Sequence, residues 1–288
     1  CDFEDDDFSA TLRRSGFRQI LAKDTFVHHF GGVTLNEVRT THGDYKTIIE
    51  MRPVFQHKWG IDPWTSRGHL VFLEQIIKDF STGETPSRVL FIEPMFGEGL
   101  LTVRNHFRRL QTPVIIDAIV TREQYMMEAA YMADSVIRLT SLDHLPDRVN
   151  GTYDMVILGA FLNVVPISDI ISFFKETYGL LNAKGFLYVS LLNYNSFEHV
   201  MENLPNDVPH LIYDSILPLN GERVFPVPRL VHALKKEFSN KSVWVGYGVQ
   251  SHYFGDISLF EQTTNEILGA SDDLHYLLSG DMVALCIR

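Results

Sequence analysis

The sequence predicts an α/β protein built on a mostly parallel sheet with helices on both faces. From residue 86 onward, strand-like apolar runs alternate with segments of helical spacing, which is typical of such sheets. The run Val89–Ile92 is continuously apolar, as expected for a strand that is buried on both faces. A turn with two glycines, Gly97 and Gly99, connects this run directly to a helical pattern.

The composition is that of an ordinary globular protein. The chain has 288 residues, of which 45% are hydrophobic and 21% charged, and its formal net charge is −11 at pH 7. These values exclude a disordered or collagen-like chain. The acidic balance, with no cluster of five or more Lys or Arg, argues against nucleic acid as a partner. At about 150 residues per domain, we expect one or two domains.

Cysteine usage and hydropathy indicate a cytoplasmic protein, and a place at the inner face of the membrane is compatible with them. Cys1 and Cys286 can form neither a disulfide framework nor a metal site by their spacing. The longest apolar run, Met155–Ile167, is shorter than the roughly 20 residues of a transmembrane helix, so we expect no membrane span. The start is acidic and lacks Met, which indicates a piece of a longer protein without a signal peptide.

The elements expected before residue 86 are short. They comprise a helix over Phe8–Ser15, strands over Phe17–Ala22 and Thr25–Phe30, and helices over Tyr45–Lys58 and His69–Phe80. The polar stretch Ser81–Pro86 then marks the best boundary between two differently patterned regions.

The elements expected after residue 86 alternate. Strands are expected over Val89–Ile92, Val114–Ile119, Ser135–Leu139, Met155–Leu158, Phe186–Leu192, Ser242–Val249 and Met282–Ile287, with helices over 100–110, Ser168–Leu181 and Arg229–Phe238. Thr121–Gln124 has the pattern of a capping box, which predicts that a helix begins there. Insertions at 193–225 and 252–279 lengthen two of the connections.

The turn Glu93–Gly99 is the most informative stretch for function. Parallel sheets bind ligands at the carboxyl ends of their strands, and glycines let a ligand approach the backbone. Glu93 and Glu98 would repel a diphosphate, and the Gly-Lys-Ser/Thr ending of a P-loop is missing. The same two carboxylates suit a cationic ligand. A plain strand-to-helix connection without a ligand remains the alternative.

Over residues 86–288 the sequence resembles class I S-adenosylmethionine-dependent methyltransferases. The segments that carry the resemblance are Glu93–Gly99, Leu142–Pro146, Tyr153–Ile157 and Leu180–Ser190. The resemblance implies a Rossmann-like doubly wound methyltransferase sheet whose last strand, Met282–Ile287, is antiparallel. It also implies S-adenosylmethionine as cofactor.

The resemblance further implies roles for single residues. Glu93 would lie near the methionine end of the cofactor, Gly97 and Gly99 would form the close turn, and Leu142 and Asp143 would lie against the adenine. Asp117 is the nearest candidate for the acidic residue that binds both ribose hydroxyls. Met95 stands where the family usually has glycine, so the turn is bulkier than in the family.

Residues 1–65 resemble the C-terminal end of family 2 glycosyltransferases of the GT-A fold. Four segments carry this resemblance in order: Phe3–Phe8 with its acidic cluster, Leu12–Phe17, Phe26–Gly32 with the pair His28-His29, and Phe55–Gly60. It implies an N-terminal α+β glycosyltransferase remnant in which Asp5 is the general base. His29 would bind the divalent metal, Mn or Mg, that the intact glycosyltransferase needs. We expect the nucleotide-binding half of that enzyme upstream of Asp5.

The two resemblances together predict a glycosyltransferase remnant (1–65), a helical linker (66–85) and a methyltransferase-like domain (86–288). The predicted function is methyl transfer to a sugar of a cell-surface polysaccharide, within a bifunctional enzyme that acts on a glycan or sugar-nucleotide acceptor. The alternative is a cofactor-free methyltransferase-like module that docks the glycosyltransferase. A nicotinamide-dependent reductase is disfavoured by Glu93 and Glu98.

Overall fold

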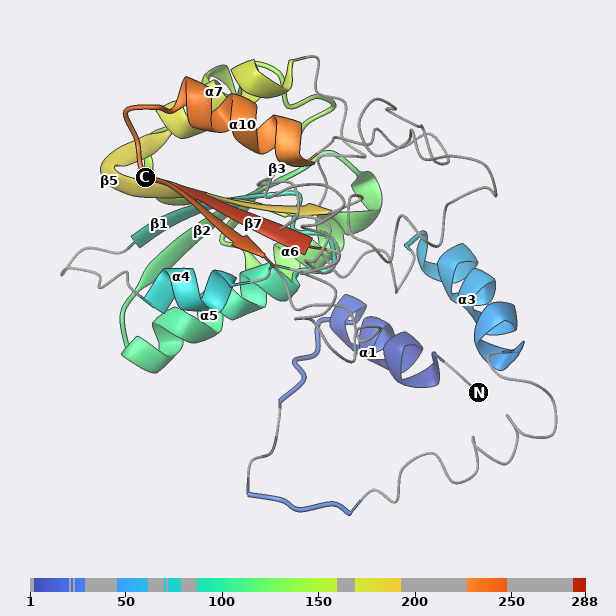
Figure 1. Ribbon diagram of the computed structural model, residues 1–288. Coiled ribbons are helices and arrows are strands. Elements are labelled where there is room, and N and C mark those ends of the chain that lie inside the picture. The colour runs from blue at the N-terminus through green and yellow to red at the C-terminus, as the bar shows by residue number, and fades with distance from the viewer. Residues whose placement is uncertain are drawn as a thin grey trace, which may run out of the picture.

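The computed structural model describes residues 3–20, 22, 24–28, 46–61, 70, 72–78, 87–159, 169–192, 227–247 and 282–288. Within these residues, seven strands form one sheet with the order β3-β2-β1-β4-β5-β7-β6, flanked by helices (Figure 1). The strands are β1 (Ser87–Ile92), β2 (Val114–Val120), β3 (Ser135–Arg138), β4 (Tyr153–Leu158), β5 (Leu181–Leu192), β6 (Val243–Tyr247) and β7 (Met282–Ile287).

The pairing of the strands confirms the predicted mixed sheet. The strand pairs β1–β2, β2–β3, β1–β4 and β4–β5 are parallel. Strand β7 is antiparallel to both of its neighbours, β5 and β6. The order turns outward from β1 in both directions, so the sheet is doubly wound and the ends of β1 and β4 lie at its switch point.

Helices overlap the expected ranges before and after residue 86, except that no helix begins at Thr121. They are α1 (Glu4–Arg14), α3 (Lys46–Trp59), α4 (Leu73–Lys78), α5 (Glu98–Leu110), α6 (Met126–Met132), α7 (Ile170–Gly179) and α10 (Val227–Glu237), with 3-10 turns η1 (Glu123–Tyr125) and η2 (Leu145–Asp147). Helices α7 and α10 lie on one side of the sheet, and α4 and α5 lie on the other (Figure 1).

Two hydrophobic clusters, one on each face, hold this arrangement together. Along β1, Val89 and Phe91 belong to the cluster on the α4–α5 face, whereas Leu90 belongs to the cluster on the α7–α10 face. Because both faces are covered, β1 has no polar alternation. This explains why its sequence is continuously apolar.

The helices before β1 pack into the same core as the sheet. Phe55 of α3 and Ile77 of α4 belong to the cluster that contains Phe91 of β1. Helix α1 is tied to α3 by Asp7, which accepts hydrogen bonds from Trp59 Nε1 at 2.7 Å and Lys58 Nζ at 2.8 Å. These apolar contacts cross the expected domain boundary near residue 85, so the packing gives that boundary no support and it stays a prediction.

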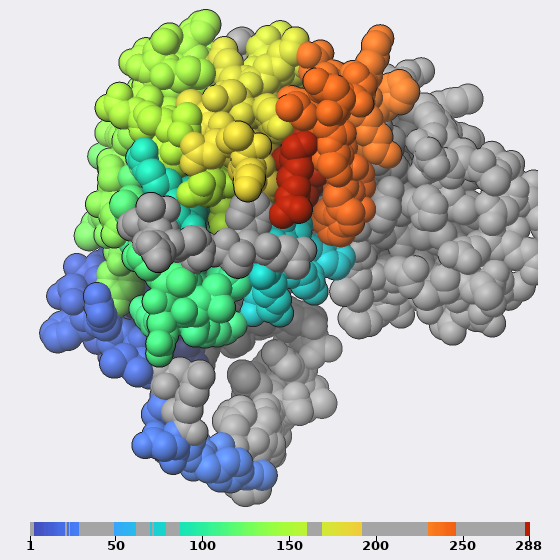
Figure 2. Space-filling view, turned by 90° about the vertical axis from the view of Figure 1, so that its left-hand side faces the viewer, coloured from blue at the N-terminus to red at the C-terminus, as the bar shows by residue number. Residues whose placement is uncertain are grey.

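A buried ion pair connects α1 to α6. Glu128 of α6 is only 1% exposed, and its carboxylate lies 2.9 Å from Arg13 Nη1 and 3.4 Å from Arg14 Nε. Figure 2 shows the N-terminal segment in blue against the green part of the chain that contains α6. A charge buried this deeply is tolerated only with such partners, so the contact fixes where α1 lies.

The two strands expected near the N-terminus do not form among the described residues. Within the described residues 17–20, 22 and 24–28 the chain forms no regular structure. Ile20 and Phe26 are both 87% exposed and Val27 is 79% exposed. Strand-like runs predicted strands here, but among the described residues no neighbouring strand pairs with them, and a strand needs such a partner.

We expect Glu128→Gln to loosen α1. It removes the acidic partner of Arg13 and Arg14, which stay partly in contact with water. The free energy of unfolding should therefore fall by about 1–3 kcal/mol rather than by the larger cost of a fully buried pair. Urea denaturation measures this change, and hydrogen exchange should show lost protection in α1 before any loss in β1.

The matched control is Glu123→Gln, because the Glu123–Arg138 pair is exposed at both side chains. Exposed pairs contribute little, so the control should change stability by less than about 0.5 kcal/mol. Equal losses in the two variants would contradict a special role for Glu128.

Candidate functional site

The turn between β1 and α5 has an unusual backbone. Three of its residues adopt the left-handed conformation, with φ of 51° at Glu93, 50° at Met95 and 83° at Gly97. For the two residues that carry a Cβ, this conformation costs about 1–2 kcal/mol each. Strain of this kind gathers at binding and catalytic sites. The turn is thus a candidate site on geometry as well as on sequence.

Glu93 is a carboxylate buried at the end of β1. Its side chain is 0% exposed, and Oε1 accepts hydrogen bonds from the backbone N–H and the hydroxyl of Thr121. Its second oxygen, Oε2, has no hydrogen-bond partner among the described residues, and Arg122 Nε lies 4.0 Å away. Burial raises the pKa of Glu93, and the hydrogen bonds from Thr121 and the charge of Arg122 only partly oppose this. Oε2 therefore has the Arg122 guanidinium beside it at ion-pair distance, but no hydrogen-bond donor in direct contact among the described residues.

The Thr121 hydroxyl is used differently from the sequence prediction. It bonds to Glu93 and caps no helix, and η1 begins at Glu123 with no side-chain cap at Arg122. The capping-box prediction was therefore wrong. In a capping box the Thr121 N–H would donate to the Gln124 side chain, but here it donates to the buried carboxyl of Glu93, which is a stronger acceptor than an amide. Only the fold brings Glu93 to the end of β2.

The two glycines of the turn allow close packing. A Cβ at Gly97, which precedes α5, would lie 2.3 Å from Met132 Cε of α6. A Cβ at Gly99 would lie 2.1 Å from Leu70 Cδ1 and 2.4 Å from Phe91 Cζ. Both contacts face other parts of the protein, so these glycines set how tightly α5 packs on α6 and on β1.

The space around the turn is largely filled. Met95 is 5% exposed and belongs to the hydrophobic cluster on the α4–α5 face. A shallow pocket of about 280 Å³ lies beside the turn, and its lining includes Gly97 and Glu98 of the turn and Arg13 of α1. Helix α1 therefore forms part of the surroundings of the turn.

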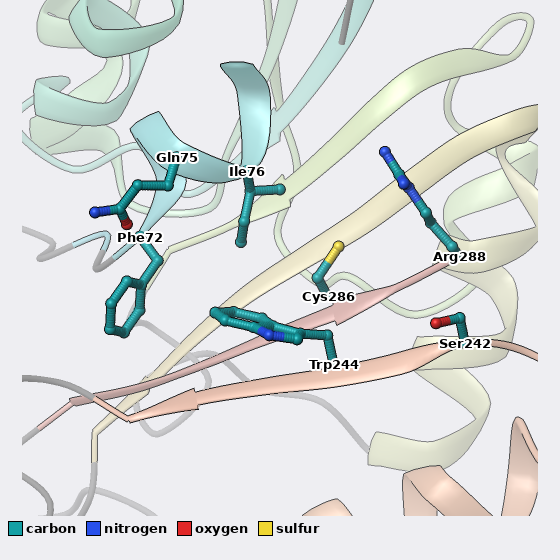
Figure 3. A pocket seen from close by; sticks show the side chains of 7 residues that line it. All are labelled: Phe72, Gln75, Ile76, Ser242, Trp244, Cys286 and Arg288. Carbon is teal, nitrogen blue, oxygen red and sulfur yellow. The ribbon is translucent and has the colours of Figure 1, made fainter. Parts of the chain in front are cut away.

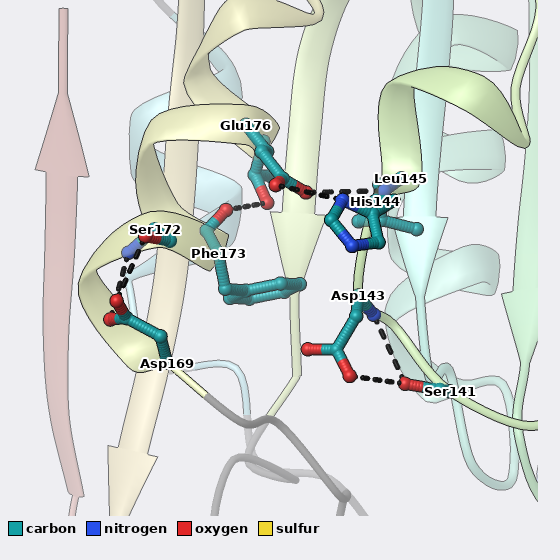
Figure 4. A network of polar contacts seen from close by, with 9 residues as sticks. Ser141, Asp143, His144, Leu145, Asp169, Ser172, Phe173 and Glu176 are labelled. Atoms are coloured by element: carbon teal, nitrogen blue, oxygen red, sulfur yellow. Dashed lines mark hydrogen bonds and ion pairs between the residues drawn. The ribbon is translucent and has the colours of Figure 1, made fainter.

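Leu142 and Asp143 follow β3, at the same edge of the sheet as Glu93. Leu142 is fully buried in the cluster on the α7–α10 face. The Ser141 hydroxyl donates a 2.8 Å hydrogen bond to the Asp143 carboxylate, and the Asp143 N–H donates to the Ser141 oxygen at 3.2 Å (Figure 4). His144 has a φ of 60°, and its Nδ1 lies 3.8 Å from Glu176. The carboxylate of Asp143 is thus held in place by its own loop.

Asp117 lies away from this edge. It is in the middle of β2, three residues before the end of the strand at Val120, or about 10 Å along it. Its carboxylate accepts hydrogen bonds from Arg88 Nη2 at 2.9 Å and from the Tyr153 hydroxyl at 3.0 Å. Burial and the charge of Asp117 raise the pKa of Tyr153 to about 12. Asp117 therefore has a structural role near the starts of β1 and β4, and we leave it out of the candidate site.

The predicted glycosyltransferase residues do not form a site in the described part of the chain. Asp5 lies exposed in the first turn of α1. His29 and both predicted insertions, 193–225 and 252–279, lie outside the described residues. No group of three or more His, Cys, Asp or Glu among the described residues could hold a metal ion. No helix in this part of the chain is long and apolar enough to span a membrane.

Comparisons with known proteins show the fold. No protein-family model matches the sequence, and no curated protein does. A SAM-dependent methyltransferase from Archaeoglobus fulgidus aligns with a TM-score of 0.50 at 11% identity, over 81% of this chain and 97% of its own. The plantazolicin methyltransferase BamL, solved with a triazolic desmethylPZN analog and SAH, gives 0.47 at 14% identity, over 88% and 93%. At 11% identity the likeness to the first protein concerns the fold alone.

The aligned length bears on the N-terminal segment. The alignment with the A. fulgidus protein covers 81% of this chain, which is more residues than the segment 86–288 contains. The alignment with the A. fulgidus protein therefore reaches into the segments before β1. This agrees with the packing of α3 and α4 into the core of the sheet.

We expect Glu93→Gln to change how stability depends on pH. Because burial raises the pKa of Glu93, the folded chain binds more protons at this carboxyl than the unfolded chain does once pH rises above the ordinary pKa of 4.5. The contribution of Glu93 to stability therefore falls as pH rises from 4.5 through the raised pKa. Relative to the parent, the Gln variant should gain stability as pH rises above 4.5, as measured by urea unfolding at each pH.

Glu98→Gln is the control, since Glu98 is an exposed residue of the same turn. Its stability relative to the parent should not vary over this range. If the Glu93→Gln difference were equally flat, the carboxyl of Glu93 would titrate normally in the folded chain.

Proposed function

We propose that this chain binds S-adenosylmethionine at the ends of β1 and β2 and transfers its methyl group to an acceptor. The observation that carries the proposal is the buried Glu93 carboxylate, whose Oε2 has no hydrogen-bond partner among the described residues. A ligand with an ammonium or sulfonium group suits this position, whereas a phosphate would be repelled. The fold shared with a SAM-dependent methyltransferase supports the same assignment.

The residues of the turn have distinct roles in this proposal. Glu93 binds the cationic methionine end, and the backbone of the turn up to Gly97 lies against it. Gly99 keeps α5 close to β1, and Leu142 and Asp143 lie beside the adenine. When bound, the cofactor supplies a methyl group on a sulfonium. The contribution of the chain is then to orient this group toward the acceptor and to hold the two together.

A cofactor-free docking module is the second candidate, and specific observations favour it. The residues at the end of β2 are Val120 and Thr121, neither of which is acidic, so the expected ribose ligand is missing there. Met132 fills the space beside Gly97. Thr121 already satisfies one oxygen of Glu93.

For the acceptor we propose a sugar of a cell-surface glycan. The resemblance of residues 1–65 to family 2 glycosyltransferases is the sole support for this acceptor and for the bifunctional enzyme. Asp5 is exposed on α1, which is held to α6 by the Arg13–Glu128 ion pair, and gives no further support to a sugar acceptor. A cytoplasmic location at the inner membrane face is likewise part of this proposal.

Ligand-induced stabilisation separates the two candidate functions. S-adenosylhomocysteine at 100 times its dissociation constant should add about 2.7 kcal/mol, a rise of several degrees in Tm. We expect this rise in the parent and in Glu98→Gln. It should be absent in Glu93→Gln, which keeps the shape of the side chain but lacks its charge. The absence of any shift in the parent at millimolar ligand would favour the docking module.

Gly97→Ala tests the position of the site with a closely matched control. Gly97 and Gly16 have nearly the same φ, 83° and 82°, but only Gly97 has an atom within 4 Å of the added Cβ. The end of Met132 can move aside, so both Ala variants should lose about 1 kcal/mol through backbone strain.

Only Gly97→Ala should weaken S-adenosylhomocysteine binding, because only Gly97 belongs to the turn. Isothermal titration calorimetry measures the affinity of each variant. Equal affinities for Gly97→Ala and Gly16→Ala would show that the cofactor does not contact this turn.

A further inference from the structure

A second cavity lies on the same face of the sheet as α4, far from the turn. It has a volume of about 510 Å³, within the range of small-molecule sites. Its lining includes Phe72 and Ile76 at α4, Trp244 on β6, and Cys286 and Arg288 at the end of β7 (Figure 3). The end of β7, in red, reaches the surface between the yellow β5 segment and the orange α10–β6 segment in Figure 2.

The position of this cavity separates it from the proposed cofactor site. In the strand order, β7 lies three strands from β1, and β6 lies four strands away. At about 4.8 Å per strand, Cys286 and Trp244 are roughly 14 and 19 Å across the sheet from β1. A ligand in this cavity would not touch Glu93, so the cavity is a site of its own.

Two aromatic side chains form one wall. The rings of Phe72 and Trp244 meet edge to face, with centroids 5.7 Å apart and an angle of 87°. Phe72 has a φ of 61°, a costly conformation for a residue with a bulky side chain. Trp244 keeps 44% of its surface exposed on the outermost strand. Phe72 and Trp244 thus form an aromatic wall beside an open, apolar surface.

One charged side chain belongs to the described part of the cavity lining. Among the described lining residues, the only charged side chain is that of Arg288, although the whole chain carries −11. Burial raises the pKa of the Cys286 thiol to about 11, and the charge of Arg288 acts against this rise. Cys286 and Arg288 both line this cavity (Figure 3). Gln75 and Ser242 add polar groups to the lining.

We propose that this cavity binds a flat aromatic carboxylate, with its ring against Trp244 and Phe72 and its carboxylate toward Arg288. The volume, the aromatic wall and the single positive charge suit such a ligand. A cationic ligand lacks an acidic partner among the described lining residues. This site is additional to the proposed methyl transfer and independent of it.

Calorimetric titration with 2-naphthoate and 2-naphthamide tests the proposal. The two probes share the ring, but only the first carries a negative charge. We expect the parent to bind naphthoate about tenfold more tightly than naphthamide, because a charge-assisted hydrogen bond is lost in the amide. Arg288→Gln should abolish this preference, whereas Lys241→Gln, the same change of charge at an exposed residue, should keep it.

Trp244→Ala should weaken the binding of both probes, while Trp59→Phe, at the contact between α1 and α3, should weaken neither. Equal affinity of the parent for the two probes, or no binding at 5 mM (roughly the weakest affinity that calorimetry resolves), would overturn the proposal. A dimer in the parent that Trp244→Ala dissociates would also overturn it, since this face would then be an interface between copies. Each of these results is independent of whether S-adenosylhomocysteine binds.

Discussion

The candidate site depends on how one buried carboxylate is satisfied. Taking a carboxylate out of water costs several kcal/mol, and Glu93 recovers part of this through Thr121 and the nearby charge of Arg122. The Glu93 N–H also donates to the Ile119 carbonyl at 2.8 Å. Backbone and side chain of Glu93 together connect the end of β1 to the end of β2. The turn comes directly after this connection and includes the left-handed backbone at Met95.

The same carboxylate has two possible uses, and they compete. Oε1 accepts two hydrogen bonds from Thr121 and supports the fold, whereas Oε2 has only the charge of Arg122 nearby and is the atom to which we assign the proposed ligand. A cationic ligand at Oε2 would favour the ionised form of Glu93, which burial alone disfavours. A methyl donor with a positive charge would profit from this arrangement more than a neutral or anionic cofactor.

The N-terminal segment shows how a local resemblance and tertiary packing can point in different directions. Its acidic cluster suggested a glycosyltransferase base at Asp5, yet its neighbour Asp7 bonds to Lys58 and Trp59 of α3. Arg13 and Arg14 of the same helix pair with the buried Glu128 of α6. The charges that stood out in the sequence thus include several that hold α1 against the sheet domain.

The sequence by itself determined the α/β class, the apolar strands and the glycine turn, because burial on both faces of β1 and the periodicity of α5 are local patterns. It also placed Glu93 at the turn. Only the tertiary structure decided which groups meet there. Thr121, which donates to Glu93, directly follows β2. Asp117 accepts hydrogen bonds from Arg88 and Tyr153 in the neighbouring strands. Met132 approaches Gly97 from α6. Such contacts join residues about 20 to 40 positions apart, and hydrogen bonding and packing at that separation leave no periodic trace in the sequence.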